Sequence, residues 1–145
     1  MIRRLDGSGV TGNLNQRNEQ IRQYCQANNK ILYDFADIES YDPGGTYFGD
    51  LYPDDGCDYD GDGELPRVET GNWATEWQAS HTEWVDWYTC GSAHSQPLNA
   101  NQKAYAAWTL CTEIAAVPEP STLLLNLASL LALAGLARAS TRAAS

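Results

Sequence analysis

Basic residues are scarce in this 145-residue chain, which has 9 Lys+Arg against 19 Asp+Glu and a formal net charge of −10. Nucleic-acid-binding proteins neutralise phosphates with basic side chains, so this composition argues against a nucleic-acid partner. The scarcity is greatest in residues 31–89, where Arg67 is the only basic residue beside 15 acidic ones. Such a density of negative charge either stays solvated on loops or is relieved by a bound cation.

Paired Cys-x-x-Cys motifs are missing as well, although the chain has four cysteines. Together with His81 and His94, the cysteines have spacings that fit no usual zinc motif. Four cysteines are typical of an exported protein in an oxidising compartment, so disulfides are the favoured expectation, with free buried thiols and a zinc site as alternatives. The cysteines are Cys25, Cys57, Cys90 and Cys111.

The folded part of the chain is predicted to be residues 1–116, because 10% aromatic residues and five tryptophans exclude simple disorder. Apolar spacing and capping residues predict a helix, a strand buried on both faces of a parallel sheet, a long loop, a short helix and a final helix. These elements cover, in order, residues 15–29, 30–36, 38–72, 72–81 and 98–115. One central strand cannot complete a sheet, so the fold class is α/β, an incomplete three-layer α-β-α fragment with an Asp-rich loop over residues 40–72.

The Asp-rich loop contains a full match to the calcium-loop pattern D-x-D-x-D-G-x5-E. Its ligands would be the carboxylates of Asp58, Asp60, Asp62 and Glu69 and the carbonyl of Glu64, which supply the oxygens that Ca²⁺ prefers. Pro66 at the ninth position and poor flanking helices depart from a paired EF-hand. A calcium site is therefore expected, and a solvated acidic loop is the alternative.

The C-terminal residues 117–145 combine a proline-bounded motif with an apolar stretch and arginines. Val117-Pro118-Glu119-Pro120-Ser121-Thr122 precedes the apolar residues 123–137, and Arg138 and Arg142 follow. The span of residues 121–137 would reach roughly 22–26 Å as a helix, slightly less than a hydrocarbon core. This tail resembles the PEP-CTERM sorting signal of Gram-negative bacteria, although Asn126 interrupts the apolar stretch and the basic end is thin.

The resemblance implies that an exosortase recognises Pro118, Glu119 and Pro120 and that residues 121–137 form a transmembrane helix. The arginines would stay on the cytoplasmic side of the inner membrane, with the folded part outside. The implied location is the cell envelope or the exterior of a Gram-negative bacterium, after transient anchoring. The alternative is an ordinary hydrophobic C-terminal helix that packs on the domain.

Export requires an N-terminal signal, yet residues 1–9 have basic charge without an apolar segment. The two ends of the chain therefore disagree. We expect this chain to be the C-terminal part of a longer gene product.

Three segments, Asn13–Arg22, Asn29–Glu39 and Ala93–Asn99, resemble the C-terminal half of a group of uncharacterised bacterial SGNH (GDSL-type) hydrolases. The resemblance implies an esterase-type site in which His94 is the general base for a serine nucleophile. The family's aspartate three residues before the histidine is Gly91 here, and no serine lies on a nucleophile elbow. The chain alone is therefore expected to be inactive, and a purely structural role for His94 is the alternative.

Four tryptophans, at positions 73, 77, 84 and 87, cluster near Tyr88. They would either stack on sugars of an exopolysaccharide or cover the sheet and the long loop. The sequence thus predicts an exported, exosortase-sorted envelope protein with a truncated SGNH-like domain. The alternative function is a non-catalytic surface module that binds calcium or exopolysaccharide.

Overall fold

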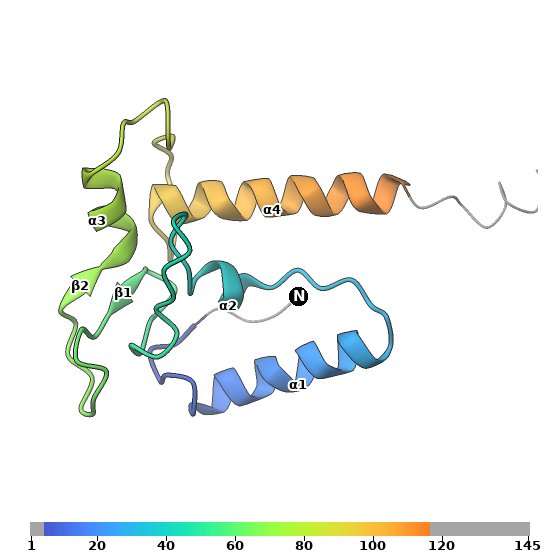
Figure 1. Cartoon of the computed structure of the whole chain (residues 1–145), viewed down its shortest axis with the longest axis horizontal. Helices are drawn as coiled ribbons and strands as arrows, with labels where there is room; N and C mark the ends of the chain where they lie inside the picture. The colour runs from blue at the N-terminus through green and yellow to red at the C-terminus, as the bar shows by residue number, and fades with distance from the viewer. Residues whose placement is uncertain (1–4, 117–145) are drawn as a thin grey trace, which may run out of the picture. The chain divides into compact units, whose positions relative to one another are not determined.

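Helices and one small sheet make up the part of the chain that this computed structural model describes, residues 5–116 (Figure 1). The elements are α1 (Asn13–Ala27), α2 (Phe35–Ile38), β1 (Asp58–Tyr59), β2 (Gly71–Asn72), α3 (Trp73–Ala79) and α4 (Pro97–Ala116). The predicted helices are confirmed as α1, α3 and α4, and the class is mixed α and β. The chain divides into two units after Thr109, and the site described below lies in the first.

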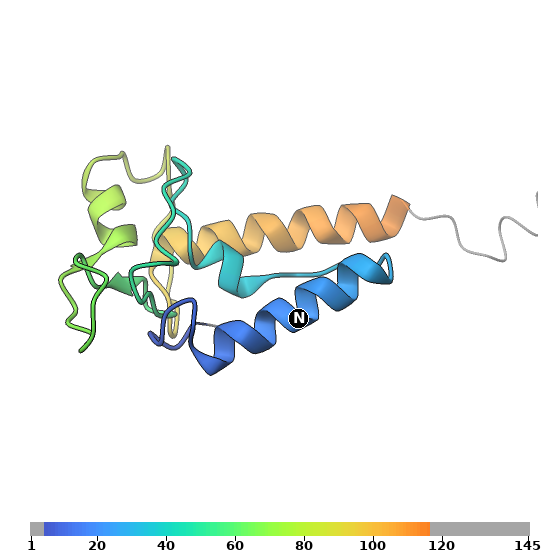
Figure 2. The same ribbon diagram turned by 60° about the horizontal axis from the view of Figure 1, so that its bottom comes forward.

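The predicted strand over residues 30–36 is wrong. Residues 31–34 are extended but belong to no sheet, and Phe35 begins α2 because the Asp34 side chain accepts a hydrogen bond from the Asp37 N–H at 3.0 Å. This extended segment passes between α1 and α4 (Figure 2). Arg22 of α1 binds Asp34 at 2.6 Å, and the Tyr33 hydroxyl donates to the carbonyl of Lys103 on α4. Two helices therefore flank the segment where neighbouring strands were expected.

The sheet consists of β1 and β2, which pair antiparallel with Asp58 opposite Asn72 and Tyr59 opposite Gly71. Residues 5–116 accordingly contain no central parallel sheet. The predicted long loop is confirmed, since most of residues 40–72 is irregular and the β1–β2 hairpin closes its second half. Asn72 ends the hairpin and caps α3, because its side chain accepts the Thr75 N–H at 3.1 Å.

The main core lies where α3, β1 and the start of α4 meet. Its fully buried members are Cys57, Trp73, Ala74 and Leu98. Phe48 packs on this cluster, with its ring stacked 5.9 Å from that of Trp73. Burial of an aromatic side chain such as Trp73 contributes about 2–3 kcal/mol to folding, so this cluster holds the long loop against the helices.

The tryptophans divide between the core and the surface. Trp77 and Trp87 pack against the core beside the buried Trp73. These three tryptophans therefore have the packing role that was the alternative to sugar binding. Trp84 is 63% exposed, and its ring meets that of the exposed Tyr88 edge-on at 5.9 Å. Only Trp84 and Tyr88 of this group therefore present aromatic surface on which a sugar ring can stack.

All four cysteines are free thiols, so the expected disulfides are not formed in this structure. Cys57 is buried, and burial raises the pKa of its thiol to about 12. Cys90 and Cys111 are exposed and Cys25 is half-buried. The thiol of Cys57 is a packing group in the core, because such a pKa keeps it protonated and unreactive.

Among the helices of residues 5–116, none is long and apolar enough to cross a membrane. The predicted span of residues 121–137 and the sorting motif Pro118-Glu119-Pro120 lie outside the described residues.

Candidate functional site

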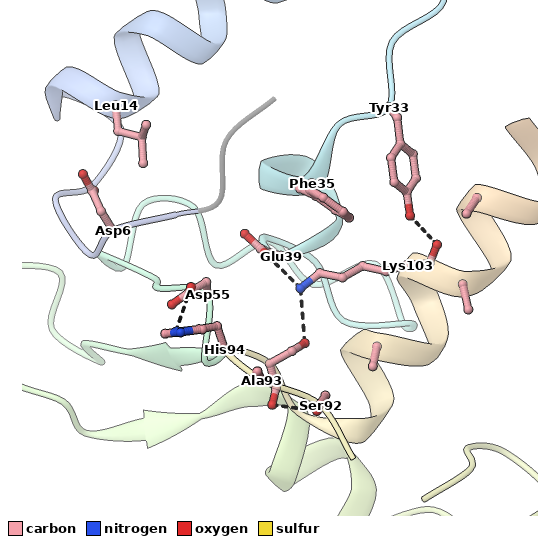
Figure 3. A pocket seen from close by; sticks show the side chains of 14 residues that line it. Asp6, Leu14, Tyr33, Phe35, Glu39, Asp55, Ser92, Ala93, His94 and Lys103 are labelled. Carbon is pink, nitrogen blue, oxygen red and sulfur yellow. Dashed lines mark hydrogen bonds and ion pairs between the residues drawn. The ribbon is translucent and has the colours of Figure 1, made fainter. Parts of the chain in front are cut away.

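A cavity of about 910 Å³ opens in the first unit, between the start of α1, the segment before α2 and one face of α4 (Figure 3). Pockets of this size hold small organic ligands. The lining combines an apolar wall with a few polar side chains. The polar and charged lining residues are Asp6, Tyr33, Glu39, Asp55, Ser92, His94, Ser95 and Lys103.

His94 and Asp55 meet at the rim of this cavity. The Nδ1 atom of His94 lies 3.5 Å from an Oδ of Asp55, an ion-pair distance that is longer than a usual hydrogen bond. The His94 side chain is 67% exposed, whereas that of Asp55 is 17% exposed. A carboxylate at Nδ1 orients an imidazole and leaves Nε2 as the base, and such contacts are often long before a ligand binds.

Local hydrogen bonds explain why two residues 39 positions apart in the sequence meet. Asp54 closes the turn that presents Asp55, because its carboxylate accepts the N–H groups of Gly56 at 2.9 Å and Asp58 at 3.1 Å. The loop before α4 is tied to the same turn, since the Gln96 side chain donates to the Gly56 carbonyl at 3.4 Å. His94 itself has a φ of 52°, a left-handed conformation that is unusual for a side chain of this size.

A second polar group lies deeper in the cavity and is centred on Lys103. The Nζ atom of Lys103 lies 2.7 Å from Glu39 and donates to the Ser95 hydroxyl at 3.2 Å. Ser95 in turn donates to Asn99 at 3.1 Å, and the other oxygen of Glu39 accepts the Leu5 N–H at 3.0 Å. These contacts pair the buried charges with one another and with neighbouring polar groups, so the group is a fixed part of the cavity wall.

Glu39 is 2% exposed, and burial raises the pKa of its carboxyl above the usual value. The ammonium of Lys103 and the Leu5 N–H oppose this shift, and the negative charge of Asp55 adds a small increase. The carboxylates of Glu39 and Asp55 therefore act on one another within the same cavity.

Gly91 was expected to leave His94 without an orienting carboxylate, but the structure places Asp55 beside its ring. Asp55 belongs to the predicted Asp-rich loop, and nothing in the sequence spacing indicated that this residue lies close to His94. The serines next to His94 are occupied elsewhere, since Ser92 donates to the Ser95 carbonyl at 3.0 Å and Ser95 to Asn99. The site thus contains a histidine–carboxylate pair without a serine aligned on it.

Two of the predicted calcium ligands, Asp60 and Asp62, accept hydrogen bonds from backbone N–H groups. Asp60 is fully buried, and the N–H groups of Val68 at 2.8 Å and Asp62 at 3.3 Å hold the pKa of its carboxyl below the usual value. The Asp62 carboxylate accepts the Glu64 N–H at 2.9 Å. Both carboxylates are therefore used to shape the tip of the hairpin.

Two of the predicted ligands, Asp58 and Glu69, do lie together, and Asp54 joins them. One carboxylate oxygen from each of the three falls within 4.8 Å of the others. Arg67 already contacts this group, because its guanidinium lies 3.0 Å from Asp54 and 2.9 Å from Glu69. The guanidinium of Arg67 therefore already pairs with carboxylates of the acidic loop, which the calcium-loop pattern did not indicate.

No protein-family model matches the chain, and neither a curated protein nor a solved structure matches it.

Proposed function

We propose that the protein is an exported envelope protein, sorted by an exosortase, whose folded part has an SGNH-like histidine site beside a ligand-binding cavity. The observation that carries the proposal is the His94–Asp55 pair at the rim of the cavity, 3.5 Å apart. The pair has the make-up of the histidine half of an ester-hydrolase site. Because no serine is aligned on His94, the site binds its ligand without turning it over.

The base character of His94 is testable with diethyl pyrocarbonate, which modifies unprotonated imidazole nitrogens. The chain has two histidines, and His81 is the internal reference because its ring stacks on Trp77 at 3.5 Å and its Nδ1 contacts the Trp77 carbonyl at 2.8 Å. We expect a fast phase of modification at 240 nm that His94→Ala removes. Asp55→Asn should slow that phase about two- to fivefold, because the imidazole ring loses the carboxylate that orients it.

The matched control is Glu83→Gln, which removes one exposed carboxylate outside the cavity and should leave both phases unchanged. A fast phase that persists in His94→Ala, or equal rates in Asp55→Asn and Glu83→Gln, would sink the assignment of the pair. Steady hydrolysis of p-nitrophenyl acetate by the 145-residue chain, lost in His94→Ala, would show that the site is catalytic after all.

Sorting is testable separately in a Gram-negative host that carries an exosortase. We expect replacement of Pro118, Glu119 and Pro120 by alanine to leave the chain uncleaved and in the membrane fraction, because the resembling family is recognised at this motif. Intact-mass measurement of the exported protein reads out the cleavage. Identical masses and fractions for the variant and the unchanged protein would contradict the role of the motif.

The alternative, a surface module that binds calcium or exopolysaccharide, has one favourable observation for each ligand. The cluster of Asp54, Asp58 and Glu69 offers oxygens to a cation, although Arg67 contacts two of them. Trp84 and Tyr88 offer exposed aromatic surface to a sugar. The histidine–carboxylate pair beside a cavity of ligand size is the more specific arrangement, so we rank this alternative second.

A further inference from the structure

The charge of the cavity lining selects among ligands. Among the described residues that line it, three are carboxylates, Asp6, Glu39 and Asp55, and one is an ammonium, Lys103. Figure 3 shows Asp6 and Asp55 on one side of the cavity and Lys103 and Tyr33 on the other. The excess of negative charge therefore lies at one end.

Lys103 does not act as an anchor for an anion. Its ammonium contacts Glu39 at 2.7 Å and Ser95 at 3.2 Å, and it lies 5.6 Å from the centre of the Phe35 ring. An anionic head group would have to displace one of these partners and come close to the buried Glu39 carboxylate. Removing one partner from a buried ion pair is strongly unfavourable, so the lining disfavours anions.

The opposite wall of the cavity is apolar. Ala100, Ala104 and Ala107 follow one another at helical spacing on one face of α4, and their small side chains leave room for a chain of methylene groups. Phe35 and Tyr33 extend this surface, with ring centroids 4.8 Å apart. Tyr33 lies on the side of Lys103, away from Asp6 and Asp55 (Figure 3), so this wall suits the uncharged chain of a ligand.

From these contacts we infer that the cavity binds a cationic amphiphile, a molecule with one positively charged amine or quaternary ammonium group and an apolar chain. The cationic group lies near Asp6 and Asp55, and the chain lies along the alanine face of α4. This inference rests on the proposed function in one respect, that the cavity is a ligand site. It names the class of ligand and needs no bond to be broken.

The test compares three probes with the same eight-carbon chain, octyltrimethylammonium, octanol and octanoate, by titration calorimetry of the whole chain at low salt. We expect the ammonium to bind at least about threefold more tightly than octanol, and octanoate to bind most weakly. Increasing salt should weaken the binding of the ammonium and leave that of octanol nearly unchanged. Tighter binding of octanoate than of octyltrimethylammonium, or no effect of salt on the cation, would overturn the inference.

Variants place the probe in the cavity. Asp55→Asn should weaken octyltrimethylammonium about three- to fivefold and leave octanol unchanged, whereas the control Glu83→Gln should change neither. Ala104→Leu should weaken all three probes, because it fills the apolar wall. Equal effects of Asp55→Asn and Glu83→Gln would contradict the assigned position of the cation.

The probes contain no ester, so this outcome is independent of the base chemistry of His94. If the cavity binds octyltrimethylammonium but Asp55→Asn leaves the rate of modification by diethyl pyrocarbonate unchanged, the ligand class stands and the hydrolase-like pair is rejected. If Asp55→Asn slows the modification by diethyl pyrocarbonate but the cavity does not bind octyltrimethylammonium, the pair stands and the ligand class is rejected.

Discussion

Arg67 is the residue on which the acidic hairpin depends most. Its guanidinium donates to the Tyr52 carbonyl at 2.8 Å and also contacts Asp54 and Glu69. The backbone of Gly7 packs directly against this side chain, since a Cβ at Gly7 would lie 2.9 Å from Nε of Arg67. One basic side chain thus connects the N-terminal segment, the turn before β1 and the hairpin tip.

Arg67→Met should lower the free energy of unfolding by about 2 kcal/mol, because it leaves the partly buried Asp54 carboxylate and the Tyr52 carbonyl without their donor. For a domain of this size the thermal midpoint should fall by about 10 °C. The control Arg17→Met removes an arginine on the exposed side of α1 and should shift the midpoint by less than about 2 °C. The measurement is thermal unfolding followed by circular dichroism.

The same variant tests the calcium prediction. Without Arg67, the oxygens of Asp54, Asp58 and Glu69 are open to a divalent cation, so Ca²⁺ should raise the midpoint of Arg67→Met more than that of the unchanged chain. EDTA should reverse the effect. Midpoints that do not respond to Ca²⁺ or EDTA in either protein would contradict a calcium role for this loop.

At the scale of elements, the sequence predicted the helices and the long loop, which depend on local residue patterns. The helices that became α1, α3 and α4 follow from apolar spacing, and the Asp-rich composition of residues 40–72 predicted their irregular course. The apolar run of residues 30–36 was misassigned because a short run of this kind suits a buried strand as well as an extended segment between helices. Ile31 is 57% exposed, which is incompatible with the burial on both faces that the strand required.

The candidate site depended on long-range contacts, and there the sequence was less informative. His94 was identified from its position before the last helix, but its partner Asp55 comes from a turn that hydrogen bonds through Gly56 and Gln96 bring near it. Lys103 and Glu39 were not singled out as site residues, although Glu39 ends one of the segments that resemble the SGNH hydrolases. The calcium pattern was present in full, but spacing alone does not reveal that Asp60 and Asp62 accept backbone N–H groups or that Glu69 contacts Arg67.

For the whole molecule, negative charge determines how stability changes with pH. Burial raises the pKa of Asp37, Glu39 and Asp54 in the folded state, whereas hydrogen bonds lower that of Asp60. A carboxyl with a raised pKa binds protons more readily when folded, so its contribution to stability is present below its usual pKa and is lost as the pH rises through the raised value. The lowered pKa of Asp60 acts in the opposite direction. The contribution of Asp60 to stability is present above its usual pKa and is lost as the pH falls through the lowered value.

We therefore expect the thermal midpoint to be higher near the usual carboxyl pKa values, at about pH 4.5, than at neutral pH, since the raised carboxyls outnumber the lowered one and the net charge of −10 adds repulsion at high pH. Added salt should reduce this difference by screening the repulsion. Glu39→Gln should make the dependence on pH shallower. A midpoint that increases steadily from about pH 4.5 to neutral pH would contradict the directions of these shifts.

The position of Arg67 has a consequence for proteolysis. Between Lys30 and Lys103 it is the only residue after which trypsin cleaves, and its side chain is held by acceptors from three parts of the chain. A protease binds the side chain at its cleavage site in an open pocket, so this bond is cut only when the hairpin opens. The rate at which trypsin cleaves between Lys30 and Lys103 therefore measures how often the hairpin opens and the Arg67 side chain leaves its acceptors.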